Sequence, residues 1–186
     1  LLFFLSLILI GCFNIMRNLE QLKNKLKNII SDYEGVNIDY ISTDTIVIEP
    51  WTRLKCQYGC PNYKKSLTCT PYPPKSDEMK KIVECYSKAI LLEFSKDYEK
   101  INKLVIEIEK ECAREGFYKA FGLGAGSCNF CDECNLKECV KPDLARPSLS
   151  AVGVDVHKTI ANNGYNILGY DEKEDIYFCY GLILLD

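Results

Sequence analysis

Four cysteine thiols lie within twelve residues of this chain, in the run Cys128-Asn-Phe-Cys131-Asp-Glu-Cys134-Asn-Leu-Lys-Glu-Cys139. A C-x2-C-x2-C run lets successive sulfurs fold around one metal centre, and ferredoxins hold iron–sulfur clusters with a closely related spacing. The last gap here is four residues rather than three, and Pro142 follows soon after Cys139. Because the fourth cysteine of such a run binds the other cluster in two-cluster ferredoxins, Cys139 need not share a centre with Cys128.

Zinc is the alternative metal for these thiols, because four thiolates also satisfy its tetrahedral coordination. Zinc sites usually place their cysteines in two separated C-x2-C pairs, whereas three of the thiols here follow one another at equal intervals. We therefore expect one four-iron, four-sulfide (4Fe-4S) cluster in this loop. The competing hypothesis is a zinc-binding structural or interaction module without redox activity.

A second set of thiols comes earlier in the chain, at Cys56, Cys60 and Cys69. Glycine and proline interrupt this stretch at Gly59, Pro61, Pro71, Pro73 and Pro74. Because such residues disfavour helices and strands, we expect all three thiols on a rigid, irregular loop. Three thiols are one ligand short of a closed site, and the fourth ligand is Cys85, Cys139, an oxygen ligand or none. An iron without a protein ligand would be open to substrate, so this set allows a second cluster.

Glycines and an arginine flank the longer cysteine run. The segment before Cys128 contains Gly124 and Gly126 but lacks the following helix and the acidic residue of a nucleotide-binding fingerprint. We expect both glycines to let the backbone approach a cluster closely and to point amide N–H groups at its sulfides. Arg146 precedes an expected helix start at Ser148, where it is either a binding group for a ligand anion or a surface arginine.

The composition narrows the class of protein. The chain has 11 cysteines, an odd number that argues against a fully paired disulfide framework, and their clustering favours metal. Such thiols must stay reduced, so we expect a cytoplasmic protein of an anaerobe. The net charge of −3 gives no electrostatic footprint for nucleic acid. One histidine, His157, which we expect to be exposed, supplies too few bases for a hydrolytic site.

Residues 1–16 form an apolar segment that we expect to lie outside the fold. The segment is too short for an ordinary membrane span and lacks the basic start of a signal peptide. Residues 9–12 resemble a lipoprotein processing box ending at Cys12. We favour a start site drawn too far upstream, with Met16 opening the protein, and membrane attachment through this segment is the alternative. Residues 17–186 then form one cysteine-rich metal-binding domain.

The remaining pattern predicts an α+β fold: a mixed sheet of about five strands with three or four helices, and the two cysteine loops meeting at one end of the sheet. We expect helices at 17–32, 76–86 and 97–115 and a further helix capped by Ser148. Strands are expected at 38–41 and 45–48 as a hairpin, centrally at 89–94, and at 117–121, 166–170 and 176–185. Cys112 and Cys179 fall on apolar faces and are expected in the core.

Two phrases together resemble a known family. The first is Cys56-Gln-Tyr-Gly-Cys60-Pro-Asn-Tyr63 followed by Cys69-Thr-Pro-Tyr-Pro-Pro74; the second is the Cys128 run followed by Ala145-Arg-Pro-Ser148 and Gly153-Val-Asp-Val156. Over residues 51–164 the chain is similar to the predicted metal-binding proteins grouped as domain of unknown function 2284, found in archaea and anaerobic bacteria. The resemblance implies that all seven cysteines of the two sets are functional. The chain departs from the family at Cys69-Thr-Pro, where Cys-Pro-Pro is more usual, and we expect this to change loop detail only.

Taken together, the residues and the resemblance predict an iron–sulfur protein with a redox role. That role is either electron transfer to a partner protein or reductive chemistry on a small molecule. A thiol-redox enzyme using Cys131 and Cys134 is the weakest class, because no thioredoxin-like βαβ pattern adjoins that pair. A membrane partner is expected only if residues 1–16 are an anchor.

Overall fold

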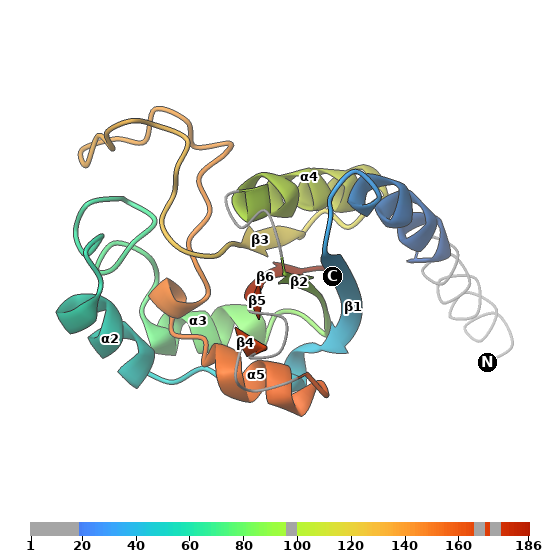
Figure 1. Cartoon of the computed structure of the whole chain (residues 1–186), viewed down its shortest axis with the longest axis horizontal. Helices are drawn as coiled ribbons and strands as arrows, with labels where there is room; N and C mark the ends of the chain where they lie inside the picture. The colour runs from blue at the N-terminus through green and yellow to red at the C-terminus, as the bar shows by residue number, and fades with distance from the viewer. Residues whose placement is uncertain (1–18, 96–99, 166–169, 172–175) are drawn as a thin grey trace, which may run out of the picture.

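The computed structural model describes residues 19–95, 100–165, 170–171 and 176–186. An antiparallel sheet with the strand order β1-β2-β6-β3 lies at its centre (Figure 1). Its strands are β1 (Val36–Ser42), β2 (Lys88–Phe94), β6 (Cys179–Leu184) and β3 (Phe121–Leu123). The helices are the helical residues 19–30, α2 (Trp51–Gly59), α3 (Ser76–Val83), α4 (Ile101–Arg114) and α5 (Val156–Asn162), with 3-10 turns η1 (Thr43–Thr45) and η3 (Ser150–Val152).

The α+β class is confirmed, but the expected mixed sheet of about five strands is wrong. β2 pairs antiparallel with β6, and β6 pairs antiparallel with β3. β2 and β3, which α4 separates in the chain, therefore run in the same direction. They do not pair with each other, because β6 lies between them. The two further strands, β4 (Tyr170–Asp171) and β5 (Ile176–Tyr177), form a separate antiparallel pair, so the predicted strand at 176–185 is divided.

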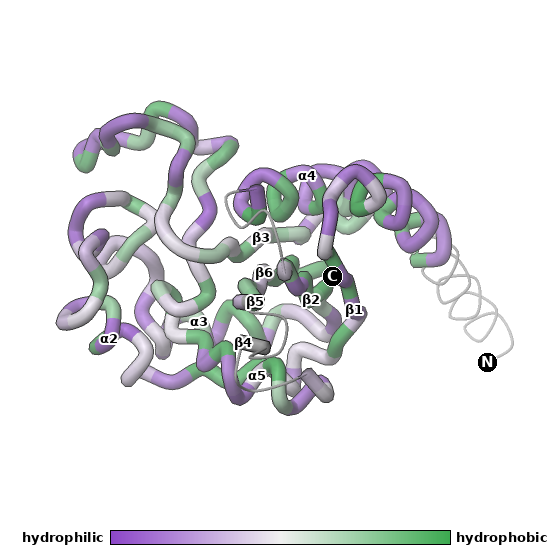
Figure 2. Tube along the Cα trace, in the orientation of Figure 1, coloured by the Kyte–Doolittle hydropathy of each residue, from purple (hydrophilic) through white to green (hydrophobic). Residues whose placement is uncertain are grey.

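Helices cover both faces of the sheet. α4 and residues 19–30 pack on one face, where Ile90 and Leu92 of β2 are fully buried. α3, α5 and η3 contribute to the core on the other face, against Ala89 and Leu91. Burial on both sides explains why β2 is a continuous apolar run, and its predicted central position is confirmed. Figure 2 shows the hydrophobic strands enclosed between these layers.

The predicted hairpin at 38–41 and 45–48 is wrong in its second strand. The hydroxyl of Ser42 accepts a hydrogen bond from the backbone N–H of Asp44 at 3.3 Å and caps the 3-10 turn η1. Short polar side chains of this kind compete with strand pairing by bonding nearby backbone groups. Ile48 then forms only an isolated bridge, with Val154.

The helix predicted after Ser148 is interrupted. The 3-10 turn η3 ends at Gly153, which has a φ of 98° and packs so closely on Ser76 that a Cβ would clash with its hydroxyl. α5 then begins at Val156, with the Asp155 side chain accepting the backbone N–H of Lys158 at 3.1 Å. A glycine in the left-handed region at this position ends the first turn, so two short elements replace the single predicted helix.

Other predictions are shifted or fall outside the described residues. The strand expected at 117–121 is displaced to β3. Of the expected strand at 166–170, only the last position belongs to the described residues. The apolar segment 1–16 lies wholly outside them. Within the described ranges, none of the helices has the length and apolar character needed to cross a membrane.

Candidate metal centre

The Cys128 set lies on a long irregular segment, residues 125–147, which leaves β3 and returns to η3 (Figure 1). Two backbone hydrogen bonds close its base. The N–H of Gly124 donates to the carbonyl of Pro147 at 2.9 Å, and the N–H of Leu149 donates to the carbonyl of Gly124 at 3.0 Å. The segment is therefore a loop with a fixed neck, and we call residues 125–147 the cysteine loop.

A buried ion pair reinforces this neck. Arg146 donates two hydrogen bonds to the Glu109 carboxylate of α4, both at 2.5 Å, and the two side chains are only 13% and 11% exposed. The backbone N–H of Gly122 donates to the same carboxylate at 2.7 Å. Because the hydrogen bonds that Arg146 donates to Glu109 raise the pKa of Arg146, the guanidinium stays charged. Glu109 thus joins the strand before the cysteine loop to the residue at its end.

The predicted roles of Arg146 and the glycines toward a cofactor stay predictions. Arg146 is engaged by an internal carboxylate, with its guanidinium 5.1 Å from the ring centroid of Phe121. Gly124 packs against Asn102 of α4, whose amide oxygen a Cβ would strike, and its N–H bonds Pro147. Gly126 has a φ of 65° with open space around it, which suits a turn toward Cys128.

Asn102 is a positioning residue that the sequence pattern did not single out. Its amide oxygen accepts the N–H of Ala125 at 3.2 Å, and its amide nitrogen donates to the carbonyl of Ser127 at 3.3 Å. Both bonds lie just before Cys128. α4 therefore fixes the first cysteine of the loop through Asn102 and the neck of the loop through Glu109.

The thiols of the cysteine loop are half-buried and free of disulfides: Cys128, Cys131, Cys134 and Cys139. Burial raises the pKa of Cys128, and the charges of Cys131, Cys139 and Cys134 raise it further, while a backbone hydrogen bond from Phe130 acts in the opposite direction. All four thiols line one small cavity. A metal that binds them must displace protons, as thiolate ligation requires.

The prediction that Cys56 sits on an irregular loop is wrong, because Cys56 belongs to the helix α2. Pro50 lies at the N-cap and Pro61 lies beyond the C-terminal end, so neither proline removes a hydrogen bond within the helix. Cys60 is the C-cap residue, and its N–H donates to the carbonyl of Cys56 at 3.3 Å. Cys69 follows on the irregular segment 60–75 and is 8% exposed.

Arg53 fixes α2 to its surroundings. Its guanidinium donates to the carbonyl of Pro74 at 2.9 Å, to that of Pro71 at 3.3 Å and to that of Ala151 in η3. One side chain thereby holds the helix, the proline-rich segment and the residues that follow the cysteine loop in a fixed relation.

The segments that carry the two cysteine sets lie against each other, because Ser66, Leu67 and Thr68, just before Cys69, line the same small cavity as the four thiols of the cysteine loop. Burial raises the pKa of Cys69 most, and the charges of Cys60, Cys56 and Cys128 raise it further, against a hydrogen bond with Thr68. The two loops lie side by side at one side of the sheet in Figure 1. Within the described residues, no three cysteine, histidine, aspartate or glutamate side chains are gathered tightly enough to hold a metal ion as they stand. Soft thiolate donors in this number still suit iron–sulfur clusters or zinc, and the ligand set stays a prediction.

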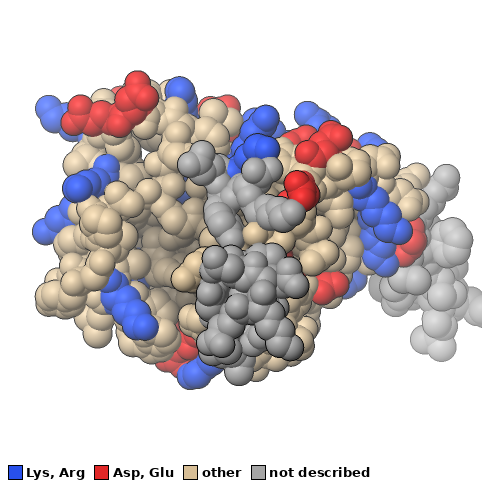
Figure 3. Space-filling model, viewed as in Figure 1, with Lys and Arg blue, Asp and Glu red and all other residues tan. Residues whose placement is uncertain are grey.

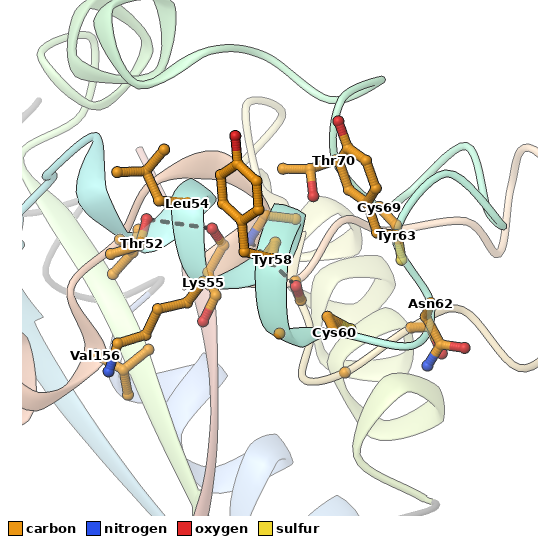
Figure 4. A pocket seen from close by; sticks show the side chains of 18 of the residues that line it. Thr52, Leu54, Lys55, Tyr58, Cys60, Asn62, Tyr63, Cys69, Thr70 and Val156 are labelled. Atoms are coloured by element: carbon orange, nitrogen blue, oxygen red, sulfur yellow. Dashed lines mark hydrogen bonds between the residues drawn. The ribbon is translucent and has the colours of Figure 1, made fainter.

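A cavity of about 920 Å³ opens beside the Cys56 set. Cys56, Cys60 and Cys69 line it together with Trp51, Leu54, Lys55 and Tyr58 of α2. Figure 3 shows a hollow bordered mainly by uncharged residues on this side of the molecule, and Figure 4 shows the lining side chains. The hydroxyl of Thr70 in the lining is buried without a hydrogen-bond partner. The sequence signal that could have revealed this side of the cavity is the spacing of Trp51, Leu54 and Tyr58 between Pro50 and Pro61.

Three cysteines of the described residues lie outside the two sets, Cys85, Cys112 and Cys179. Cys112 of α4 is fully buried in the core, as predicted, and burial raises its pKa to about 12. Cys179 is half-buried and packs against the same core cluster. Cys85 is exposed, and its thiol donates to the carbonyl of Lys81 at 3.4 Å. His157 is exposed, as expected.

Comparison with known proteins gives one match. No curated protein and no solved structure matches the chain significantly. The model of the family described as "Predicted metal-binding protein (DUF2284)" matches residues 39–185, a range that contains both cysteine sets, the cysteine loop with its neck, and the cavity beside α2. The chain therefore belongs to this family of predicted metal-binding proteins.

Proposed function

We propose that this protein binds an iron–sulfur cluster in the cysteine loop and uses it in a redox reaction. The observation that carries the proposal is the set of four free thiols, Cys128 and the three that follow it, which line one small cavity on a loop with a fixed neck. Membership in a family of predicted metal-binding proteins supports the metal. The repeated three-residue spacing of Cys128, Cys131 and Cys134 favours a cluster over a zinc ion.

Cys128, Cys131, Cys134 and Cys139 would hold the cluster, and one-electron transfer is the chemistry that it supplies when bound. Cys56, Cys60 and Cys69 would hold a second centre. Three thiols leave one coordination position without a protein ligand, and the cavity lined by these cysteines gives a small molecule access to them. The protein's contribution is to fix α2 through Arg53 and the cysteine loop through Glu109 and Asn102.

The test is a metal assay on anaerobically purified protein. We expect about four irons and four acid-labile sulfides per chain for one cluster, and about eight of each if the Cys56 set also holds a cluster. Cys134→Ser should lower the iron content of the cysteine loop, whereas Cys85→Ser, which replaces an exposed thiol outside both sets, should leave it unchanged. One or two zinc ions without iron, even after reconstitution with iron and sulfide, would leave a zinc-stabilised interaction module instead.

A further inference from the structure

We propose that the cavity beside α2 binds an elongated organic acid, with an aromatic or similarly flat apolar body and one carboxylate. The cavity volume of about 920 Å³ lies within the range of roughly 300–1,000 Å³ that is usual for sites of small organic ligands. The proposal goes beyond the iron–sulfur function and does not depend on which metal the Cys56 set binds.

The apolar wall of the cavity comes from one face of α2. Trp51, Leu54 and Tyr58 recur at intervals of three and four, which places them on the same side of the helix. They are 37%, 56% and 81% exposed, and all three line the cavity. A cluster of large exposed apolar side chains at a concave surface marks a binding site rather than an ordinary helix face. An aromatic body would cover this wall and remove it from water.

The charge of the cavity fits an acid. Lys55 is the only lysine or arginine among the described lining residues, and its ammonium nitrogen lies 5.1 Å from the ring centroid of Trp51. The lining carboxylate, Asp155, is 2% exposed and already caps α5 by accepting the N–H of Lys158. The accessible charge beside the aromatic wall is therefore the cation of Lys55, which a ligand carboxylate would neutralise.

The arrangement of these groups indicates an elongated ligand. Figure 4 shows Lys55, Leu54 and Val156 at one side of the cavity and Cys60 and Cys69 at the other, with Tyr58 between them. The partnerless hydroxyl of Thr70, next to Cys69, adds a polar group near the thiols. A molecule whose carboxylate meets Lys55 and whose body crosses Tyr58 would present its far end to the Cys56 set.

The test uses 3-phenylpropionate as the probe and its neutral amide, 3-phenylpropanamide, as the matched compound. Titration calorimetry is done anaerobically on the full chain as purified, and the emission of Trp51, the only tryptophan, locates the site. We expect saturable binding of the acid with a change in Trp51 emission. The amide should bind about fivefold more weakly, as expected for the loss of one solvent-exposed charge pair.

Two lysine variants test whether Lys55 binds the carboxylate of the ligand. Lys55→Met should weaken binding of the acid about fivefold and leave binding of the amide unchanged. Lys64→Met is the control, because the Lys64 ammonium also lies near an aromatic ring, that of Tyr63 at 5.3 Å, but does not line the cavity. Absence of saturable binding, or equal binding of acid and amide by the unaltered protein, would overturn the proposal. Metal content is assayed on the same samples: a zinc protein that binds the acid refutes the iron–sulfur function alone, and an iron protein that does not bind it refutes this inference alone.

Discussion

The buried pair of Glu109 and Arg146 allows a sharp prediction about how the cysteine loop is held. Glu109→Gln keeps the size of the side chain and one acceptor oxygen but removes the charge. The substitution leaves the Arg146 guanidinium, 13% exposed, without a counter-charge. Glutamine also cannot accept both bonds from Arg146 and the bond from the Gly122 N–H as the carboxylate does.

The expected magnitude follows from the burial of the pair. Removing one partner of a buried ion pair destabilises a protein by about 3 kcal/mol or more. For a chain of this size, about 3 kcal/mol corresponds to a fall in melting temperature of about 6–12 °C. Because the same carboxylate closes the neck of the cysteine loop, the variant should also retain less metal than the unaltered protein after purification.

Thermal unfolding followed by circular dichroism measures the effect, and Glu111→Gln is the matched control. Glu111 lies on the same helix and its side chain is also 11% exposed, but its partners Lys25 and Arg114 are 50% and 68% exposed. Ion pairs with solvent-exposed cations contribute little to stability, so the control should lower the melting temperature by less than about 4 °C. Equal shifts for the two variants would refute the argument that burial of Arg146 sets the strength of this neck.

Three further predictions concern packing, pH and thiol reactivity. Gly124→Ala should destabilise the protein by about 1–3 kcal/mol, because its Cβ meets Asn102, whereas Gly59→Ala, with open space around it, should not; equal losses in urea unfolding would contradict this. Metal loading at Cys128 and Cys69 should rise with pH, because the raised pKa values of these thiols keep them protonated at lower pH, and a metal binds the thiolate. Equal metal content at pH 6 and pH 9 would contradict this. Cys112, with a pKa of about 12, should have about 1 thiolate in 10⁴ at pH 8 and resist iodoacetamide until the protein is unfolded; its labelling in native protein, read by mass spectrometry, would show that it is accessible.

Local patterns predicted much of the scaffold, and non-local contacts account for most of the errors. The apolar run of β2 and the apolar stripe of α4 are determined by burial, which leaves a periodic trace in the sequence. The insertion of β6 between β2 and β3 joins segments far apart in the chain, and no local pattern records such a pairing. The error at Cys56 has a different origin, because proline disrupts a helix only from within it and both prolines here lie outside α2.

The candidate ligand cysteines could be predicted from the sequence, but the residues that hold their segments in place could not. The spacing of cysteines is visible in the sequence, since ligands close together on a short loop need little help from the fold. Glu109, Asn102 and Arg53 act on residues 13 to 98 positions away in the chain, so their partners emerge only in three dimensions. The cavity likewise depends on α2 lying beside η3, and the sequence of neither segment alone predicts this contact.

Spectroscopy decides whether the cysteine loop holds an iron–sulfur cluster. Anaerobically purified protein is examined by visible absorption and electron paramagnetic resonance before and after a one-electron reductant, with zinc assayed on the same sample. We expect brown protein with a broad sulfide-to-iron absorption that bleaches reversibly as a paramagnetic signal appears. The part of that signal that belongs to the cysteine-loop cluster should be lost in Cys134→Ser and kept in Cys85→Ser. Colourless protein that holds zinc and takes up no iron would contradict the iron–sulfur function.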